Sequence, residues 1–328
     1  AALDMVEVAE SWPARPTSWM LAHYADTPLN LLAFQVLGLD TGIELQRLGL
    51  LTSLLALAAL VVWTWRVVGN SQASRGARLA ILSPVVAVLL TTIGSYDAFT
   101  VLAWAIAVWV WQANTQRGMW AAGVLLGFQH FEHALLGSIA LVLTWHAVRD
   151  RLNSPLNQRN PLNFIPGIIG GKVVLILIFL ANGQPPLGRT GWIERYFGDW
   201  SRNLIATFPS LLWALFAGLW LLVILVFLRL PNRRYAILFV AGIAVGLLGT
   251  ALSADRPRVF VVVMLPSLLL MIVAYLRSTE TSKLELRAVE ALAWLGPPIV
   301  LAGRESVNTD VVQYWFTALW MLGLGGPG

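Results

Sequence analysis

The sequence predicts an all-α fold, a polytopic bundle of transmembrane helices, and three observations support this prediction. Of the 328 residues, 58% are hydrophobic and 12% are charged, whereas about a quarter of an ordinary soluble domain is charged. Between residues 49 and 324 the chain repeatedly runs apolar for about 15–20 residues, enough for a full crossing or a short tilted one. Arginines gather in the loops at one side of these runs, as the positive-inside rule describes for the cytoplasmic side.

The first clear span covers residues 49–65 and ends at Arg66. The loop after it carries Arg75 and Arg78 and almost no acidic residue, so this span is predicted to run from outside to inside. Ala1 then lies outside, and a preceding span or a cleaved signal peptide is expected before it. Further apolar runs bring the expected total to about eleven spans, at residues 79–94, 99–113, 119–129, 134–148, 164–181, 209–229, 235–253, 259–276, 289–303 and 310–324.

Residues 119–148 allow either one long helix or two short ones. Arg117 precedes this region and Arg149 follows it, so both flanks are predicted to be cytoplasmic, which requires two crossings. The polar stretch 129–133 then separates the crossings and faces outside. The outer face also collects residues 1–48, the turn 95–97, the loop 182–208, residues 254–258 and residues 304–310.

The chain shows no internal repeat and no Gly/Ser-rich linker. Residues 1–48 are predicted to form an outer-face loop with an interfacial helix, because Leu29, Leu32 and Phe34 follow Pro28 in an amphipathic arrangement. Residues 49–328 are predicted to form the multi-span domain, which includes the outer-face loop 182–208.

Composition and charge exclude several other classes of protein. The net charge of +5 comes from basic residues in short loops beside apolar runs, where membrane topology explains them, so no nucleic-acid site is predicted. The absence of Cys excludes disulfides, thiolate metal sites and a Cys nucleophile.

Carboxylates beside arginines on the outer face favour a phosphate-bearing lipid as substrate. Arg binds phosphate through paired hydrogen bonds, and a carboxylate can serve as general base. Asp4, Glu7 and Glu10 are spaced by three residues and would share one face of a helix. A solvated acidic loop is the alternative interpretation of the same three residues.

His130, Glu132 and His133 include the two histidines that are closest in sequence. Histidines at positions i and i+3 beside a carboxylate could bind a divalent metal ion. They could equally donate hydrogen bonds to a phosphate or substrate, or pack at a helix break. No metal site is predicted, because the spacing is not His-Glu-x-x-His and no third strong ligand follows nearby.

Asp255, Arg256 and Arg258 lie between two spans, where Pro257 fixes a turn. Two arginines there favour a phosphate or pyrophosphate head group, and an Asp–Arg pair that only anchors the turn is the competing interpretation. Lys172 lies within an apolar run and is expected to snorkel or to pair. The predicted substrate-binding residues are Asp97, His130, Glu132, His133, Arg195, Arg202, Asp255, Arg256, Arg258 and Arg304.

Residues 26–54, from Asp26-Thr-Pro-Leu-Asn to Leu-Leu-Thr-Ser-Leu, resemble a recurrent pattern of the GT-C-fold glycosyltransferases. In that family an interfacial helix with a Pro-Leu start runs through a Gly corner into an Arg-Leu that opens the second span. The pattern continues with Leu82-Ser83-Pro84, Ser95-Tyr96-Asp97 and the polar break 129–133. The resemblance covers about the first 150 residues and implies a missing first span.

The resemblance implies a plasma-membrane enzyme that transfers a sugar from a polyprenyl-phosphate carrier to an acceptor at the outer face, with inversion. It implies a catalytic base just after the first span, where Asp4 lies, with Glu7 as the nearest second carboxylate. Met5 stands where relatives have the second member of an acidic pair. The resemblance also implies that outer-face cations hold the donor phosphate, with Arg256 and Arg258 as the first candidates.

Three other classes remain open on the sequence alone. One is a noncatalytic GT-C-like subunit that binds membrane lipid or a partner membrane protein. Another is a transporter of lipid-linked substrates, against which the lack of an inverted repeat argues. The last is an intramembrane metallohydrolase built on His130, Glu132 and His133.

Overall fold

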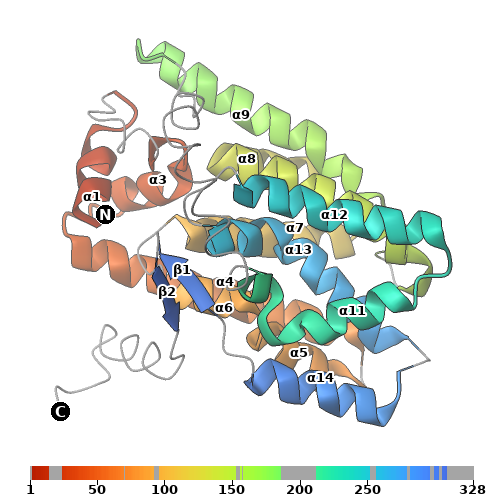
Figure 1. Cartoon of the computed structure of the whole chain (residues 1–328). Coiled ribbons are helices and arrows are strands. Elements are labelled where there is room, and N and C mark those ends of the chain that lie inside the picture. The colour runs from red at the N-terminus through yellow and green to blue at the C-terminus, as the bar shows by residue number, and fades with distance from the viewer. Residues whose placement is uncertain are drawn as a thin grey trace, which may run out of the picture.

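Helices form nearly all the regular structure of the described residues, and Figure 1 shows them side by side in a bundle. The described residues also contain two strands, β1 (Ile299–Ala302) and β2 (Glu305–Asn308), which pair as a short antiparallel ribbon. The helical fold class is therefore confirmed. The structure is a computed structural model that describes residues 2–14, 24–69, 71–91, 96–152, 156, 158–185, 212–251, 256–278, 281–295, 299–302 and 305–308.

Several helices have the length and composition to cross a membrane, as expected of a membrane protein. The described residues contain five such helices. They contain six candidate crossings if α5 (Ala73–Ile81) and α6 (Pro84–Thr91), which are bent by 45° at their junction, are counted together as one span. α7 (Asp97–Gln112) is apolar but shorter. The count of about eleven spans stays a prediction. Within the described residues, the five are α4 (Gly42–Val68), α8 (Gln116–Val148), Pro161–Ala181 with η3 (Pro161–Asn163) and α9 (Phe164–Ala181), α12 (Arg233–Ala251), and Pro257–Arg277 of α13 (Arg256–Arg277).

The remaining helices are short, and local chemistry explains several of their boundaries. α4 begins before the predicted span because Thr41 and Glu44 form a capping box, in which Thr41 Oγ1 accepts from the Glu44 backbone N–H. Pro84 starts α6 and interrupts the apolar run predicted as one span over 79–94. The other helices are α1 (Ala2–Ser11), α3 (Pro28–Val36), η1 (Arg149–Arg151), η4 (Ala217–Leu219), α11 (Trp220–Leu228) and α14 (Lys283–Leu295).

The predicted span 289–303 is wrong in its second half. α14 ends at Leu295, and residues 299–302 form the strand β1. The sequence between them reads Gly296-Pro297-Pro298, and proline cannot continue a helix because it lacks the N–H and clashes with the preceding turn.

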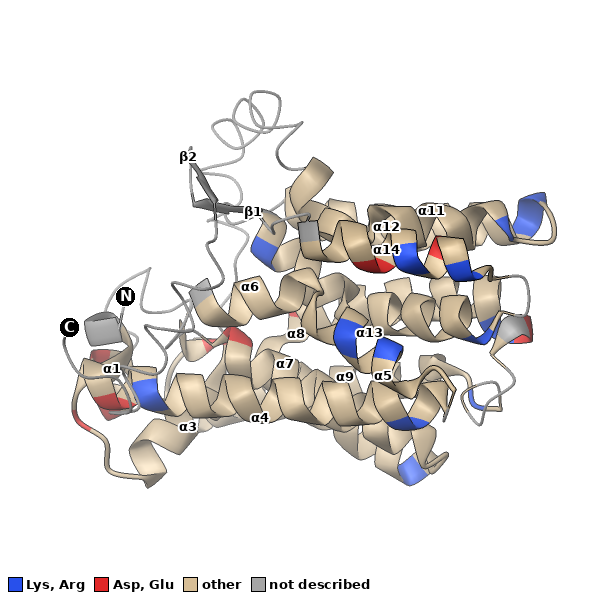
Figure 2. Cartoon of the chain, turned by 90° about the horizontal axis from the view of Figure 1, so that it is seen from below, with Lys and Arg blue, Asp and Glu red and all other residues tan. Residues whose placement is uncertain are grey.

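The two ends of the bundle differ in charge, as Figure 2 shows by the blue segments grouped at the end opposite α1. Ion pairs tie α14 to its neighbours there: Arg78 Nη2 lies 2.8 Å from Glu290 Oε1, and Arg229 Nη2 lies 2.6 Å from Glu285 Oε2. We call this the arginine-rich end, and the opposite one the α1 end. By their positions at helix ends and their contacts, the arginines of the arginine-rich end are Arg66, Arg75, Arg78, Arg117, Arg149, Arg159, Arg229, Arg233, Arg234 and Arg277.

α8 consists of two arms that meet at His130, whose φ of −158° and ψ of 86° are not helical. Near the first arm, Arg159 Nε donates to Asn114 Oδ1 at 2.7 Å. In the second arm, Trp145 Nε1 donates to the carbonyl oxygen of Leu156 at 2.8 Å. Because a straight helix of this length would span about 50 Å, these contacts require α8 to fold back, with His130 at the α1 end. The contacts agree with the predicted break in this region.

Glycines bring the first arm of α8 very close to α9. A Cβ atom on Gly123 would lie 2.3 Å from the carbonyl oxygen of Phe164, and one on Gly127 would lie 2.0 Å from that of Ile168. A Cβ atom on Gly167 or Gly171 would lie just as close to carbonyl oxygens of α8, at 2.1 and 2.2 Å. Pairs of small residues one turn apart are a usual way for membrane helices to approach. The outward side of α9 exposes Ile169, Val173, Val174, Leu177 and Leu180, which suits contact with lipid.

Candidate functional site

The polar residues that surround the bend of α8 come from helix ends and from the bend itself. Tyr96 and Asp97 start α7, residues 129–133 form the bend, and Arg258 lies in the first turn of α13. Helix ends and breaks leave backbone groups unpaired, so polar side chains gather there at less cost than in a helix interior. The candidate site is this cluster at the α1 end.

Arg258 and Asp97 form an ion pair inside this cluster. Arg258 Nη1 lies 3.3 Å from Asp97 Oδ2, and the Asp97 side chain is 0% exposed. Arg258 Nη2 donates to Tyr96 Oη at 3.1 Å, and the guanidinium lies 5.4 Å from the centre of the Tyr96 ring. The first turn of α7 also favours a negative charge at Asp97 through the helix dipole. The pair therefore holds a cation in a fixed position beside an aromatic ring.

The two histidines lie face to face. Their ring centres are 3.5 Å apart and their planes differ by 9°, while the Tyr96 ring centre lies 5.4 Å from that of His130. His130 Nδ1 lies 3.5 Å from Glu132 Oε2, and both histidines are buried. Within the described part of the chain, no group of three or more His, Cys, Asp or Glu side chains has the geometry to hold a metal ion. His130, Glu132 and His133 therefore do not form a ligand set for a divalent metal ion in this structure.

Gln129 connects the bend to two other elements, although the sequence predicts no role for it beyond the polar break. Its Oε1 accepts from the backbone N–H of Leu29 at 2.8 Å, and its Nε2 donates to the carbonyl oxygen of Tyr96 at 3.3 Å. The first turn of α3 and the start of α7 are thus joined through one buried amide. Its place at the start of the polar stretch 129–133 is the signal in the sequence that could have suggested this role.

A second ion pair lies on the α9 side of the bend. Lys172 Nζ lies 3.0 Å from Asp26 Oδ1, and it lies 5.9 Å from the centre of the Phe131 ring. Both side chains are largely buried. The expectation that Lys172 pairs is confirmed, whereas nothing in the sequence indicated Asp26 as its partner. A single ionisable residue in an apolar span is itself a signal of function.

The predicted catalytic residues Asp4 and Glu7 lie on α1, at the same end as the ion pairs. Glu7 and Glu10 are both exposed on this helix, and the side chain of Asp4 lies outside the described residues. The buried face of α1 carries Met5, Val8 and Ala9, and together with Trp12, just after the helix, these residues pack with residues of α3, α4 and α9. α1 is thus fixed to the bundle by apolar contacts.

The structure brings together Asp97, His130, Glu132, His133 and Arg258 of the predicted substrate-binding residues. Arg256 begins α13, but its side chain is outside the described part of the chain. The remaining four predicted residues, Arg195, Arg202, Asp255 and Arg304, also lie outside the described residues.

This arrangement is suited to binding an anion beside groups that exchange protons. Arg258 supplies a permanent charge and a planar set of donors that fits phosphate oxygens. Imidazoles can gain or lose a proton near neutral pH. No family model matches the chain, and neither does any curated protein or any solved structure.

Proposed function

We propose that this chain is a membrane glycosyltransferase of the GT-C type, which moves a sugar from a polyprenyl-phosphate carrier to an acceptor. The observation that carries the proposal is the buried pair of Arg258 and Asp97 beside Tyr96 and the stacked histidines. A cation that is already positioned next to aromatic rings, at the end of a bundle of apolar helices, suits a lipid phosphate.

The orientation of the bundle supports a reaction at the outer face of the plasma membrane. The arginine-rich end is assigned to the cytoplasm by the positive-inside rule. The α1 end, which holds both ion pairs, is then assigned to the outside. Helices α1 and α3 lie at this same end (Figures 1 and 2). An acceptor at the outer face can approach this end, while the polyprenyl tail stays in the bilayer.

In the proposed reaction Arg258 binds the donor phosphate, and Asp97 holds the guanidinium in place. Arg256, Arg195, Arg202, Asp255 and Arg304 are further candidates for contacts to the donor. The acceptor oxygen attacks the anomeric carbon, the bond from that carbon to the phosphate oxygen breaks, and polyprenyl phosphate leaves with the bonding electrons. The acceptor proton passes to a carboxylate of α1, Asp4 or Glu7, which acts as general base. Attack opposite the leaving group inverts the anomeric centre.

One observation favours a noncatalytic alternative. Met5 occupies the position of the second acidic residue, and it is 2% exposed within the apolar face of α1. A carboxylate at this position would therefore lie in the core rather than beside an acceptor. A GT-C-like subunit that binds the same lipid, or a partner membrane protein, without transferring a sugar is consistent with this packing.

The substitution Asp4→Asn separates these two functions. Native membranes that contain the chain are supplied with a panel of polyprenyl-phosphate sugars. The wild-type chain is expected to consume one donor and to release free polyprenyl phosphate, and mass spectrometry measures both lipids. Asp4→Asn should lower this rate about 100-fold or more, the usual effect of losing a general base, and should leave lipid binding unchanged. Glu10→Gln, on the same helix, is the matched control and should keep the rate.

Three other outcomes have a definite meaning. If Asp4→Asn consumes the donor as fast as the wild-type chain, Asp4 is not the base, and Glu7→Gln makes the same test of Glu7. A wild-type chain that binds polyprenyl phosphate but consumes no donor supports the noncatalytic subunit. A chain that binds polyprenyl phosphate no better than polyprenol contradicts both functions.

A further inference from the structure

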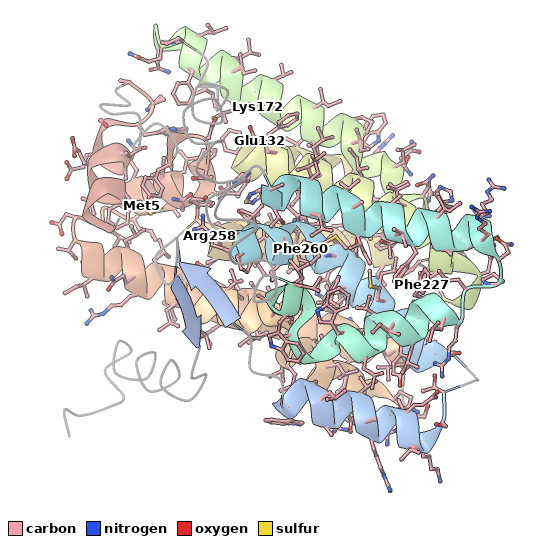
Figure 3. All side chains as sticks on the ribbon, in the orientation of Figure 1. Met5, Glu132, Lys172, Phe227, Arg258 and Phe260 are labelled. Atoms are coloured by element: carbon pink, nitrogen blue, oxygen red, sulfur yellow. The ribbon has the colours of Figure 1, made fainter. Side chains whose placement is uncertain are left out.

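Two ion pairs lie on either side of the bend of α8, and the proposed function uses only one of them. Lys172 and Asp26 form the other, from α9 and from the turn before α3. Figure 3 shows Lys172, Glu132 and Arg258 in the part of the bundle toward α1, whereas Phe227 lies toward the arginine-rich end. The α1 end therefore holds two cations that belong to different helices.

Stability alone is a weak reason for the Lys172–Asp26 pair. Removing two charges from water is costly for each ion, and replacing a buried pair by apolar residues is often neutral or stabilising. The surroundings are apolar, because Phe131 lies under the ammonium and the α9 residues Leu175 and Phe179 pack nearby against α1. An ionisable group within a membrane span more often serves a substrate or an ion than the fold.

The segment 24–30 connects Asp26 to the first ion pair. The Tyr24 ring meets the Tyr96 ring edge to face at 6.2 Å, and Tyr96 in turn accepts a hydrogen bond from Arg258. Three residues after Asp26, the backbone N–H of Leu29 donates to Gln129 in the bend. One short segment therefore contacts α7, α8 and α9, so the two ion pairs belong to one connected polar region.

Asn30, on α3 and four residues after Asp26, carries an unsatisfied amide. Its side chain is 1% exposed, and within the described part of the chain neither its Oδ1 nor its Nδ2 has a hydrogen-bond partner. A buried amide without partners destabilises the fold, and a polar ligand that reached it would relieve this cost. Lys172 remains 17% exposed and Glu132 38% exposed, so the polar region is not sealed from the surface.

We propose that Lys172 is a second phosphate-binding cation of this site and that Asp26 is the counter-ion which the phosphate displaces. The proposal rests on the proposed function, because it extends the lipid-phosphate site from Arg258 to Lys172. A phosphate group offers more charge and more acceptor oxygens than one carboxylate. When it binds, Lys172 exchanges one anionic partner for another, and the Asp26 carboxylate turns toward water.

The two members of the pair should have opposite effects on binding. The full chain is placed in nanodiscs of neutral lipid at pH 6.5, and binding of undecaprenyl phosphate is measured by native mass spectrometry, with undecaprenol as the phosphate-free comparison. Lys172→Met should weaken binding about tenfold or more, through loss of a charge-assisted hydrogen bond. Asp26→Asn should strengthen binding about threefold or more, because no carboxylate competes for the ammonium.

Controls keep this test independent of folding. Lys172→Arg keeps the charge and should keep the affinity, and Arg233→Met removes an exposed arginine at the other end and should change nothing. The double variant Asp26→Asn with Lys172→Met leaves no unpaired charge, and it should fold but bind as weakly as Lys172→Met. Inorganic phosphate is added as a competitor: displacement of the lipid at millimolar concentration identifies free phosphate as the ligand and overturns the lipid assignment.

The proposal is wrong if Lys172→Met, or the double variant, binds undecaprenyl phosphate as well as the wild-type chain. It is equally wrong if Asp26→Asn weakens binding as much as Lys172→Met, because the pair would then only join α9 to the segment before α3. In both cases weaker binding by Arg258→Met would still support the proposed function. If the wild-type chain does not prefer undecaprenyl phosphate to undecaprenol, the proposed function itself fails.

Discussion

At the scale of single residues, the ion pair between Asp97 and Arg258 joins the starts of two helices that are 161 residues apart in sequence. The Asp97 side chain is fully buried, and Arg258 is 16% exposed. Removing one partner of such a pair leaves the other charge in a low-dielectric environment. The two residues should therefore be coupled in stability as well as in binding.

Asp97→Asn or Arg258→Met alone should destabilise the chain by about 3–5 kcal/mol. The double variant should lose less than the sum of the two, because it leaves no buried charge without a partner. Thermal unfolding in detergent, or an SDS titration, measures all three variants. Additive losses would show that the two side chains do not interact in the folded protein.

Single residues also show how far the sequence could predict the site. Asp97, His130 and Arg258 were predicted as binding residues because each lies where an apolar run stops, which is visible in the sequence. The pairing of Asp26 with Lys172 could not be predicted, since it depends on how segments 146 residues apart fold together. The sequence predicts Tyr96 only as part of a turn, because its contact with Arg258 depends on the same long-range packing.

At the scale of helices, the close contact of α8 with α9 depends on glycines at particular positions. Gly127→Ala would place a Cβ atom 2.0 Å from a backbone oxygen of α9, so the helices must separate. The expected loss of stability is about 1–3 kcal/mol, the usual cost of overpacking.

Gly170→Ala is the matched control, because its Cβ atom would meet its nearest neighbour at an ordinary 3.8 Å. It should be neutral or should stabilise α9 by up to about 1 kcal/mol, since Ala favours a helix more than Gly does. The same detergent unfolding assay compares the two variants. Equal effects at both positions would contradict the close packing at Gly127.

Hydropathy predicts where most helices lie, but it predicts less well the residues at which they begin and end. The runs 99–113, 164–181 and 235–253 correspond to α7, α9 and α12 within a few residues. The run 79–94 missed the bend before Pro84, and the run 289–303 crossed a Gly-Pro-Pro sequence into a strand. Hydropathy averages over a window, whereas proline acts at a single residue.

At the scale of the whole molecule, the two ends of the bundle should lie on opposite sides of the membrane. The chain has no Cys, so single cysteines can be introduced without a background. Exposed positions at the arginine-rich end are Gln116, Asp150 and Asn232, and Gln35 is an exposed position of α3.

In intact cells, a membrane-impermeant maleimide should label a cysteine at Gln35 and none at the other three positions. All four should be labelled after the cells are opened, which controls for reactivity. Labels at Gln116 and Asp150 on opposite sides would show that α8 crosses the membrane once. Labelling of Asn232 in intact cells would reverse the proposed orientation.

The bend of α8 has a consequence for how the protein is made. The first arm, residues 116–129, is about 21 Å long, less than the roughly 30 Å of hydrocarbon in a bilayer. An arm of this length does not reach across that thickness, so we expect both arms to enter the membrane together and to carry the polar bend across as a loop. With the α1 end outside, Asp97 reaches the far side before them, and at about 5–20 residues per second Arg258 is synthesised roughly 10–30 s after Asp97. During that interval we expect water to solvate the Asp97 carboxylate, and we expect the pair with Arg258 to form only when α13 inserts into the bundle.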